Sequence, residues 1–140
     1  MTNDTVAVAS APSTPTVVRG DSLDSIHRAR EASRAFTGRL APAPDATTAD
    51  SLVLVVSELT TNALRHGGGR YTLVLSATTD SVTAAVSDPS PELPRERTPD
   101  LNGGSGGFGW HMLRCLATEL MVTRGTGPAT GKTIRARLAF

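Results

Sequence analysis

Apolar residues recur along the chain at spacings that separate helices from strands. They fall every three or four positions from about residue 22 to Leu40 and again, more regularly, from about Thr47 to His66. The prolines of APAPD at 41–45 interrupt the two runs, and the glycines at 67–69 follow the second. We therefore predict two amphipathic helices, and the second has one continuous apolar face: Leu52, Val55, Val56, Leu59 and Ala63.

Alternating patterns after residue 70 predict strands. Tyr71–Thr78 and a segment through Val82, Ala84 and Val86 flank a Thr79-Asp80 turn and should form a hairpin. We expect an edge strand at 16–18, a helix at 108–118, and strands at 120–124 and 133–139. This order predicts an α/β (α+β) fold, a two-layer sandwich with helices on one face of a mixed, mainly antiparallel sheet.

Residues 1–15 are small, polar and contain prolines, so we expect a disordered tail before one domain at 16–140. A long loop at about 89–107 is rich in proline and then in glycine. Loops of this length inside a domain are usually functional lids or disordered segments. We interpret it as a lid.

Composition excludes several classes of function. The chain has 140 residues and a net charge of +1, and its basic residues are scattered, which argues against direct nucleic-acid or membrane partners. The only cysteine, Cys115, rules out a disulfide within the chain, and we expect it to be a core residue. Without a leader pattern or an apolar run near 18 residues, we expect a cytoplasmic protein.

Three polar residues of the second helix share one side next to its apolar face: Glu58, Asn62 and His66, at i, i+4 and i+8. A solvated helix face explains them about as well as a functional site does. In the functional interpretation, Asn62 supplies a neutral oxygen ligand for Mg²⁺, and Glu58 orients or deprotonates a nucleophile.

Asp88 follows the alternation of the hairpin strand and should point toward the helices. A carboxylate at the end of an apolar face needs a hydrogen-bonding partner, and the amino group of a buried base would serve. The alternative is a turn aspartate before Pro89.

Glycines precede the helix at 108–118, where a helix N-terminus could approach phosphate, although a flexible hinge explains them equally well. The segment 127–133 looks like a P-loop but has Thr126 where that motif needs glycine, and a strand follows it. It is better explained as a turn into the last strand, with Lys132 or Thr133 facing a ligand.

Taken in order, four segments resemble the boxes of the Bergerat-fold (GHKL) ATPase superfamily. They are SELTTNALRH at 57–66, VSDPSP at 86–91, GGFGWHML at 106–113 and GKTIRARL at 131–138. Within it, the chain is most similar to anti-sigma-factor serine/threonine kinases. Departures from the family pattern are Trp110, where leucine is usual, and Ser90 and Pro91, where many relatives have glycine.

The resemblance implies roles for individual residues. Asn62 would bind Mg²⁺, Glu58 would act as general base or polarise the acceptor hydroxyl, and Asp88 would bind the adenine amino group. Gly107 and Gly109 would let the loop and the helix start wrap the phosphates, Thr133 would support the adenine end, and His66 matches a family position at the nucleotide without an assigned role. Lys132 is a further candidate for the nucleotide from its place at the turn into the last strand.

The resemblance also implies an activity and partners. The chain would be an ATP-dependent protein serine/threonine kinase with ATP and Mg²⁺ as cofactors and a role in transcription regulation. Its partners would be a sigma factor, an anti-sigma-factor antagonist protein, or both, and it could form a homodimer. The alternative is a non-catalytic nucleotide-sensing interaction module.

Overall fold

The computed structural model describes residues 14–92, 106–125 and 131–140. Most of the predicted tail at 1–15 and of the predicted lid at 89–107 lies outside these residues. Eight elements follow one another along the described chain. They are β1 (Thr16–Gly20), α2 (Ser25–Gly38), α3 (Ala46–His66), β2 (Tyr71–Ala77), β3 (Ser81–Asp88), α4 (Gly106–Leu116), β4 (Glu119–Arg124) and β5 (Lys132–Ala139).

Helix α3 begins where the sequence predicts. Asp45 Oδ1 accepts a hydrogen bond from the backbone N–H of Thr48 at 2.8 Å, which satisfies one free donor of the first turn. Helix α2 begins a few residues later than predicted, because residues 22–24 form a turn in which Ser25 N–H donates to Ser22 O. Asp24, at the N-cap of α2, makes no capping bond.

The five strands form one sheet in the order β1-β2-β3-β5-β4. Every neighbouring pair is antiparallel, so the predicted mixed sheet is purely antiparallel in the described chain. The hairpins β2–β3 and β4–β5 explain two of these pairings, since a hairpin necessarily joins antiparallel strands.

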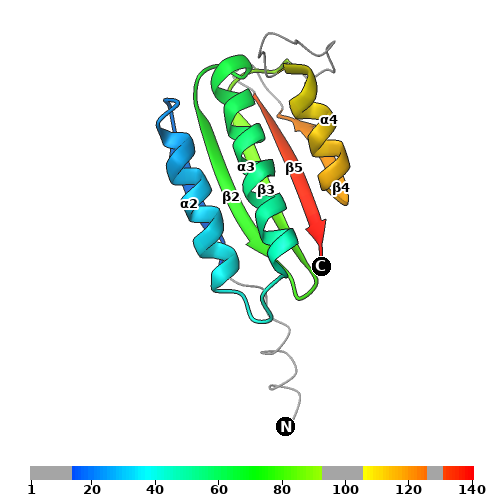
Figure 1. Ribbon diagram of the computed structural model, residues 1–140. Coiled ribbons are helices and arrows are strands. Elements are labelled where there is room, and N and C mark those ends of the chain that lie inside the picture. The colour runs from blue at the N-terminus through cyan, green and yellow to red at the C-terminus, as the bar shows by residue number, and fades with distance from the viewer. Residues whose placement is uncertain (1–13, 93–105, 126–130) are drawn as a thin grey trace.

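The three helices lie side by side on one face of the sheet (Figure 1). Helix α3 lies over the central strands, flanked by α2 next to β1 and β2 and by α4 next to β4. The aliphatic side chains between the layers form the core, and its largest fully buried members are Phe36, Leu52, Leu59, Leu73, Leu75 and Leu113. This confirms the predicted two-layer α/β sandwich.

Strand β5 shows how the two faces of the sheet differ. Ile134, Ala136 and Leu138 are buried beneath the helices, whereas Arg135 and Arg137 point to the helix-free face. Lys132 has the parity of the buried residues and is itself buried. This places a buried ammonium group at one end of the sheet.

Two side chains of α4, Cys115 and Trp110, differ in burial. Cys115 is exposed, so its predicted core position is wrong; the buried residue of that part of α4 is Leu113. Trp110 is partly buried and packs against the core. No helix in the described ranges has the length and apolar character needed to cross a membrane.

Candidate functional site

The polar side of α3 begins at Glu58. Glu58 and Asn62, one helical turn apart, are half-buried, and His66 at the end of the helix is exposed. Burial raises the pKa of the Glu58 carboxyl, and the nearby positive charge of Arg65 opposes this increase without cancelling it. Glu58 is therefore a carboxylate that accepts a proton more readily than an exposed one.

Helix α4 approaches this side of α3 at a glycine. A Cβ placed on Gly109 would lie 2.6 Å from Glu58 Oε2, so only glycine leaves room for the carboxylate in this position. The Glu58 carboxyl group consequently lies against the first turns of α4. Gly107 is in the first turn of the same helix.

At the end of the sheet, Asp88 and Lys132 form a buried ion pair. The two residues are directly opposite each other in β3 and β5, and both point toward the helices. Lys132 Nζ donates to Asp88 Oδ1 at 3.0 Å and to Ser90 O at 3.2 Å. The side chains of Asp88 and Lys132 are only 4% and 6% exposed.

The Asp88 carboxylate is also fixed from the backbone. Ser90 N–H donates to Asp88 Oδ1 at 2.9 Å. Burial raises the pKa of Asp88, and the bonds from Lys132 and Ser90 oppose the increase. Thus Oδ1 is held by two donors, and the carboxylate has one defined orientation.

Two glycines surround Asp88 closely. A Cβ on Gly67, directly after α3, would overlap Asp88 Oδ2 and come within 2.9 Å of the Ala63 Cα. A Cβ on Gly131 would overlap the Asp88 carbonyl. The backbone at the end of α3 therefore contacts the carboxylate with no side chain between them, and this contact connects Asp88 to the helix of Glu58 and Asn62.

Thr133 does not join this cluster. Its hydroxyl is 2.7 Å from Ser87 Oγ, and both residues have the parity of the helix-free face. Of the two neighbouring residues that the sequence suggests could face a ligand, Lys132 points toward the helices and Thr133 points away from them.

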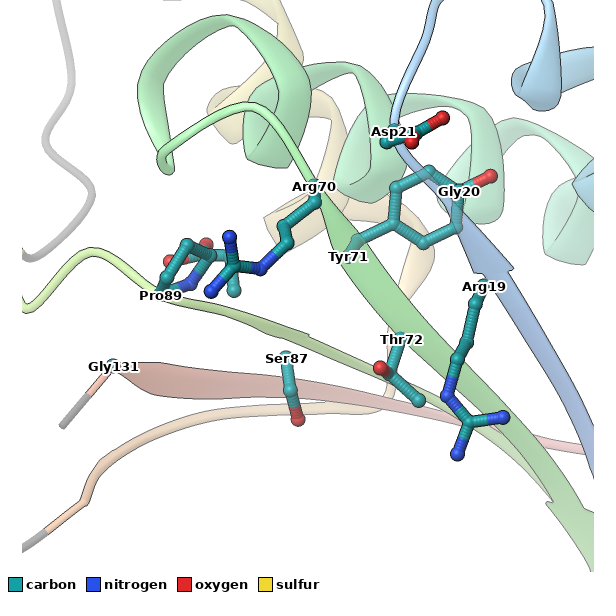
Figure 2. Close-up of a pocket in the computed structure, with 10 residues that line it drawn as sticks. Arg19, Gly20, Asp21, Arg70, Tyr71, Thr72, Ser87, Pro89 and Gly131 are labelled. Carbon is teal, nitrogen blue, oxygen red and sulfur yellow. The ribbon is translucent and has the colours of Figure 1, made fainter. Parts of the chain in front are cut away.

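A hollow of about 630 Å³ opens at the same end of the sheet (Figure 2). Arg19, Thr72 and Ser87 point to its helix-free side, while Arg70 extends toward Pro89. Asp88 and Gly131 also line the hollow, whereas neither Glu58 nor Asn62 does so within the described chain. Asp88 thus lines this hollow, whose described charged residues are two arginines and two aspartates, and also contacts the end of α3.

The structure pairs some of the predicted site residues but does not bring all of them into one cluster. Glu58 and Gly109 are in contact, and Asp88 contacts Gly67 and Lys132. Sequence reasoning missed the ion pair and the role of Gly67. The parity of Lys132 with Ile134 was the available signal for the ion pair, since a buried lysine requires a partner.

Comparisons with known proteins agree with this architecture. The sequence model of the histidine kinase-like ATPase domain matches residues 21–138. No curated protein matches the chain.

A solved structure, that of the RsbU and RsbW domains of Rv1364c from Mycobacterium tuberculosis, has a similar fold. Its TM-score is 0.63 at 17% sequence identity, over 90% of this chain. The chain matches only 32% of the length of that solved chain, about a third.

Proposed function

The chain belongs to the histidine kinase-like ATPase domain family, and from this premise we propose that it is a Mg·ATP-binding regulatory protein, a serine/threonine kinase of the anti-sigma-factor type. The observation that carries the proposal is the placement of Asp88. Its buried carboxylate contacts the end of the helix that bears Glu58 and Asn62. Asp88 thereby offers a hydrogen-bond acceptor for the nucleotide base. Further along α3, Asn62 is suited to bind a metal ion and Glu58 to accept a proton.

The residues present fit a nucleotide. The carboxylate of Asp88 makes its described hydrogen bonds through Oδ1, which leaves Oδ2 to accept from an exocyclic amino group. Asn62 offers an amide oxygen to Mg²⁺, an ion that keeps phosphate oxygens and water as its other ligands. Gly109 and Gly107, in the first turns of α4, allow the backbone to approach phosphate without a side chain between them.

Glu58 is suited to accept a proton. In the proposed reaction the hydroxyl oxygen of a serine or threonine attacks the γ-phosphorus and the bond to the β-phosphate oxygen breaks. The hydroxyl proton passes to Glu58, and ADP leaves. The raised pKa of Glu58 makes its carboxylate a better base for this step. Mg²⁺, when bound, would neutralise charge on the phosphates.

The proposed partners are a sigma factor and an antagonist protein that carries the acceptor hydroxyl. The family and the fold similarity to a structure containing an RsbW domain support this assignment. If γ-phosphate is transferred to such an antagonist and the transfer is lost in Glu58→Ala, the chain is a kinase. Intact ATP binding with no transfer to any partner tested would favour a nucleotide sensor.

The first test measures ATP affinity by calorimetry, with and without Mg²⁺. Asp88→Asn should weaken binding at least tenfold, the size expected for loss of a hydrogen bond to a charged group. Asn62→Ala should remove most of the effect of Mg²⁺. Asp50→Asn, an exposed carboxylate on α3, is the control and should bind ATP as the wild type does. Unchanged affinity in Asp88→Asn would contradict the base-binding assignment.

A further inference from the structure

The buried ion pair of Asp88 and Lys132 leaves part of each group without a hydrogen-bonding partner among the residues that the structure describes. A lysine ammonium has three N–H donors, and within the described residues Lys132 uses two of them, toward Asp88 Oδ1 and Ser90 O. Asp88 Oδ2 accepts no hydrogen bond from the described chain. With respect to the described chain, one N–H of Lys132 and one carboxylate oxygen of Asp88 therefore remain available, although both side chains are more than nine-tenths buried.

Every fully buried side-chain nitrogen and oxygen of the described chain has a hydrogen-bonding partner, so an Oδ2 that has none is reached by solvent, and a ligand could reach it in the same way. Because Lys132 Nζ donates to Asp88 Oδ1, the third N–H of Lys132 and the Oδ2 of Asp88 belong to the same ion pair. The pair therefore offers one donor next to one acceptor. The glycine at 67 keeps any side chain from covering Oδ2 on the side of α3. The pair thus presents a polar edge rather than a closed ion pair.

Adenine has the complementary edge. Its amino group is a donor, and the neighbouring ring nitrogen N1 is an acceptor. We propose that Lys132 is a specificity-determining residue that donates to adenine N1 while Asp88 Oδ2 accepts from the amino group. This inference rests on the proposed function, which supplies the nucleotide. It adds the Lys132 ammonium group to Asp88 as a second protein group that binds the base.

The arrangement selects against other bases in the same orientation. Guanine has the acceptor O6 where adenine has its amino group, so it would set an oxygen against the Asp88 carboxylate. Two charged groups acting at adjacent base atoms also discriminate more strongly than one, because a ligand that lacks either atom loses one of two charge-assisted hydrogen bonds.

A purely structural role for Lys132 is the competing explanation. In that case Lys132 neutralises Asp88 and joins the β3 and β5 ends but never contacts the base. Deleting the base atom rather than the residue separates the two explanations, because the folded protein is then unchanged. The probe is 1-deaza-ATP, in which N1 is replaced by C–H and the amino group is retained.

Calorimetric titration of the wild-type protein with Mg·ATP and with Mg·1-deaza-ATP tests the inference directly. We expect 1-deaza-ATP to bind about tenfold more weakly or worse, the effect of losing a charge-assisted hydrogen bond. Equal affinities would overturn the role of Lys132 and leave the proposed function intact. If neither nucleotide binds, the proposed function itself fails.

A variant then assigns the effect to the residue. In Lys132→Met, ATP and 1-deaza-ATP should bind with the same affinity. The triphosphate of unsubstituted purine, which lacks the amino group, should still bind more weakly than ATP because Asp88 remains. The control is Arg135→Met on the same strand, whose side chain is exposed on the helix-free face; it should keep the wild-type preference for ATP. Persistent discrimination in Lys132→Met would contradict the inference. If Lys132→Met does not fold, the wild-type comparison still decides.

Discussion

Lys132 Nζ lies 3.0 Å from Asp88 Oδ1 across paired positions of β5 and β3, with both side chains buried beneath the helices. Breaking such a pair by removing one partner leaves an uncompensated charge in a poorly hydrated place. We expect Lys132→Met to lower the free energy of unfolding by about 3–5 kcal/mol in urea titrations. The double variant Asp88→Asn, Lys132→Met should recover much of this loss.

The exposed ion pair of Arg137 and Glu119 provides the control for this measurement. Its atoms are 3.3 Å apart, but the side chains are 40% and 59% exposed. Arg137→Met should therefore change the free energy of unfolding by less than about 1 kcal/mol. Equal losses of stability in Lys132→Met and Arg137→Met would contradict the explanation that burial strengthens the ion pair of Lys132.

Glycine is required at position 67 because of its close contact with the Asp88 carboxylate, not because of a positive φ angle. Gly67→Ala would force apart the Asp88 carboxylate and the end of α3, including the fixed Ala63 backbone. We expect a loss of about 1–3 kcal/mol in the free energy of unfolding, typical of an overpacked site. ATP affinity should fall as well, because Asp88 is displaced.

Gly38→Ala is the matched control for Gly67→Ala. A Cβ at Gly38 meets nothing within 4 Å, and the residue lies in α2. That substitution should be neutral or slightly stabilising, because alanine favours helix and restricts the unfolded chain. A loss of stability in Gly38→Ala similar to that in Gly67→Ala would show that steric contact with Asp88 is not the cause.

The sequence predicts the fold well because its periodicities are strong. The apolar face of α3 and the alternation in β2 and β5 identify the elements and their buried faces without tertiary information. The predicted start of α2 near residue 22 is too early, because Asp21 and Ser22 are of residue types that favour a helix N-cap. The chain instead forms a turn there, which a local pattern cannot distinguish from a cap.

The site was only partly predictable, since contacts between distant segments leave weak traces in a sequence. The parity of Asp88 correctly predicts its direction. The partner of Asp88 lies 44 residues away on β5, and its identity depends on strand order and register. The same limit applies to Gly109 and Glu58, which meet only because α4 packs beside α3.

A buried hydrogen bond connects Tyr71, at the start of β2, to Ser25, at the start of α2. The Tyr71 hydroxyl, which has one proton to donate, is 2.9 Å from Ser25 Oγ and 3.2 Å from Ser25 O. Tyr71→Phe keeps the ring but removes these bonds, so we expect a loss of about 1 kcal/mol in urea unfolding. Ser25 Oγ retains its bond to Ser22 O, which limits the effect. A loss above about 3 kcal/mol would point to a structural role beyond these bonds.

The raised pKa of Glu58 predicts how stability depends on pH. Below its ordinary value of 4.5 the carboxyl is protonated in both the folded and the unfolded chain, and Glu58→Gln should have a melting temperature close to that of the wild type. Between 4.5 and the higher folded pKa the unfolded chain has already released this proton, so folding must either rebind it or bury the ionised carboxylate, and the wild type loses stability relative to the neutral variant as pH rises through this range. The difference in melting temperature, Glu58→Gln minus wild type, should therefore be near zero at pH 4 and positive at pH 7.5. Contributions of the other titrating groups cancel in this difference. A negative value at pH 7.5 would mean that the ionised carboxylate is stabilised where it lies, by Arg65 or by the first turns of α4, and that burial does not dominate its environment.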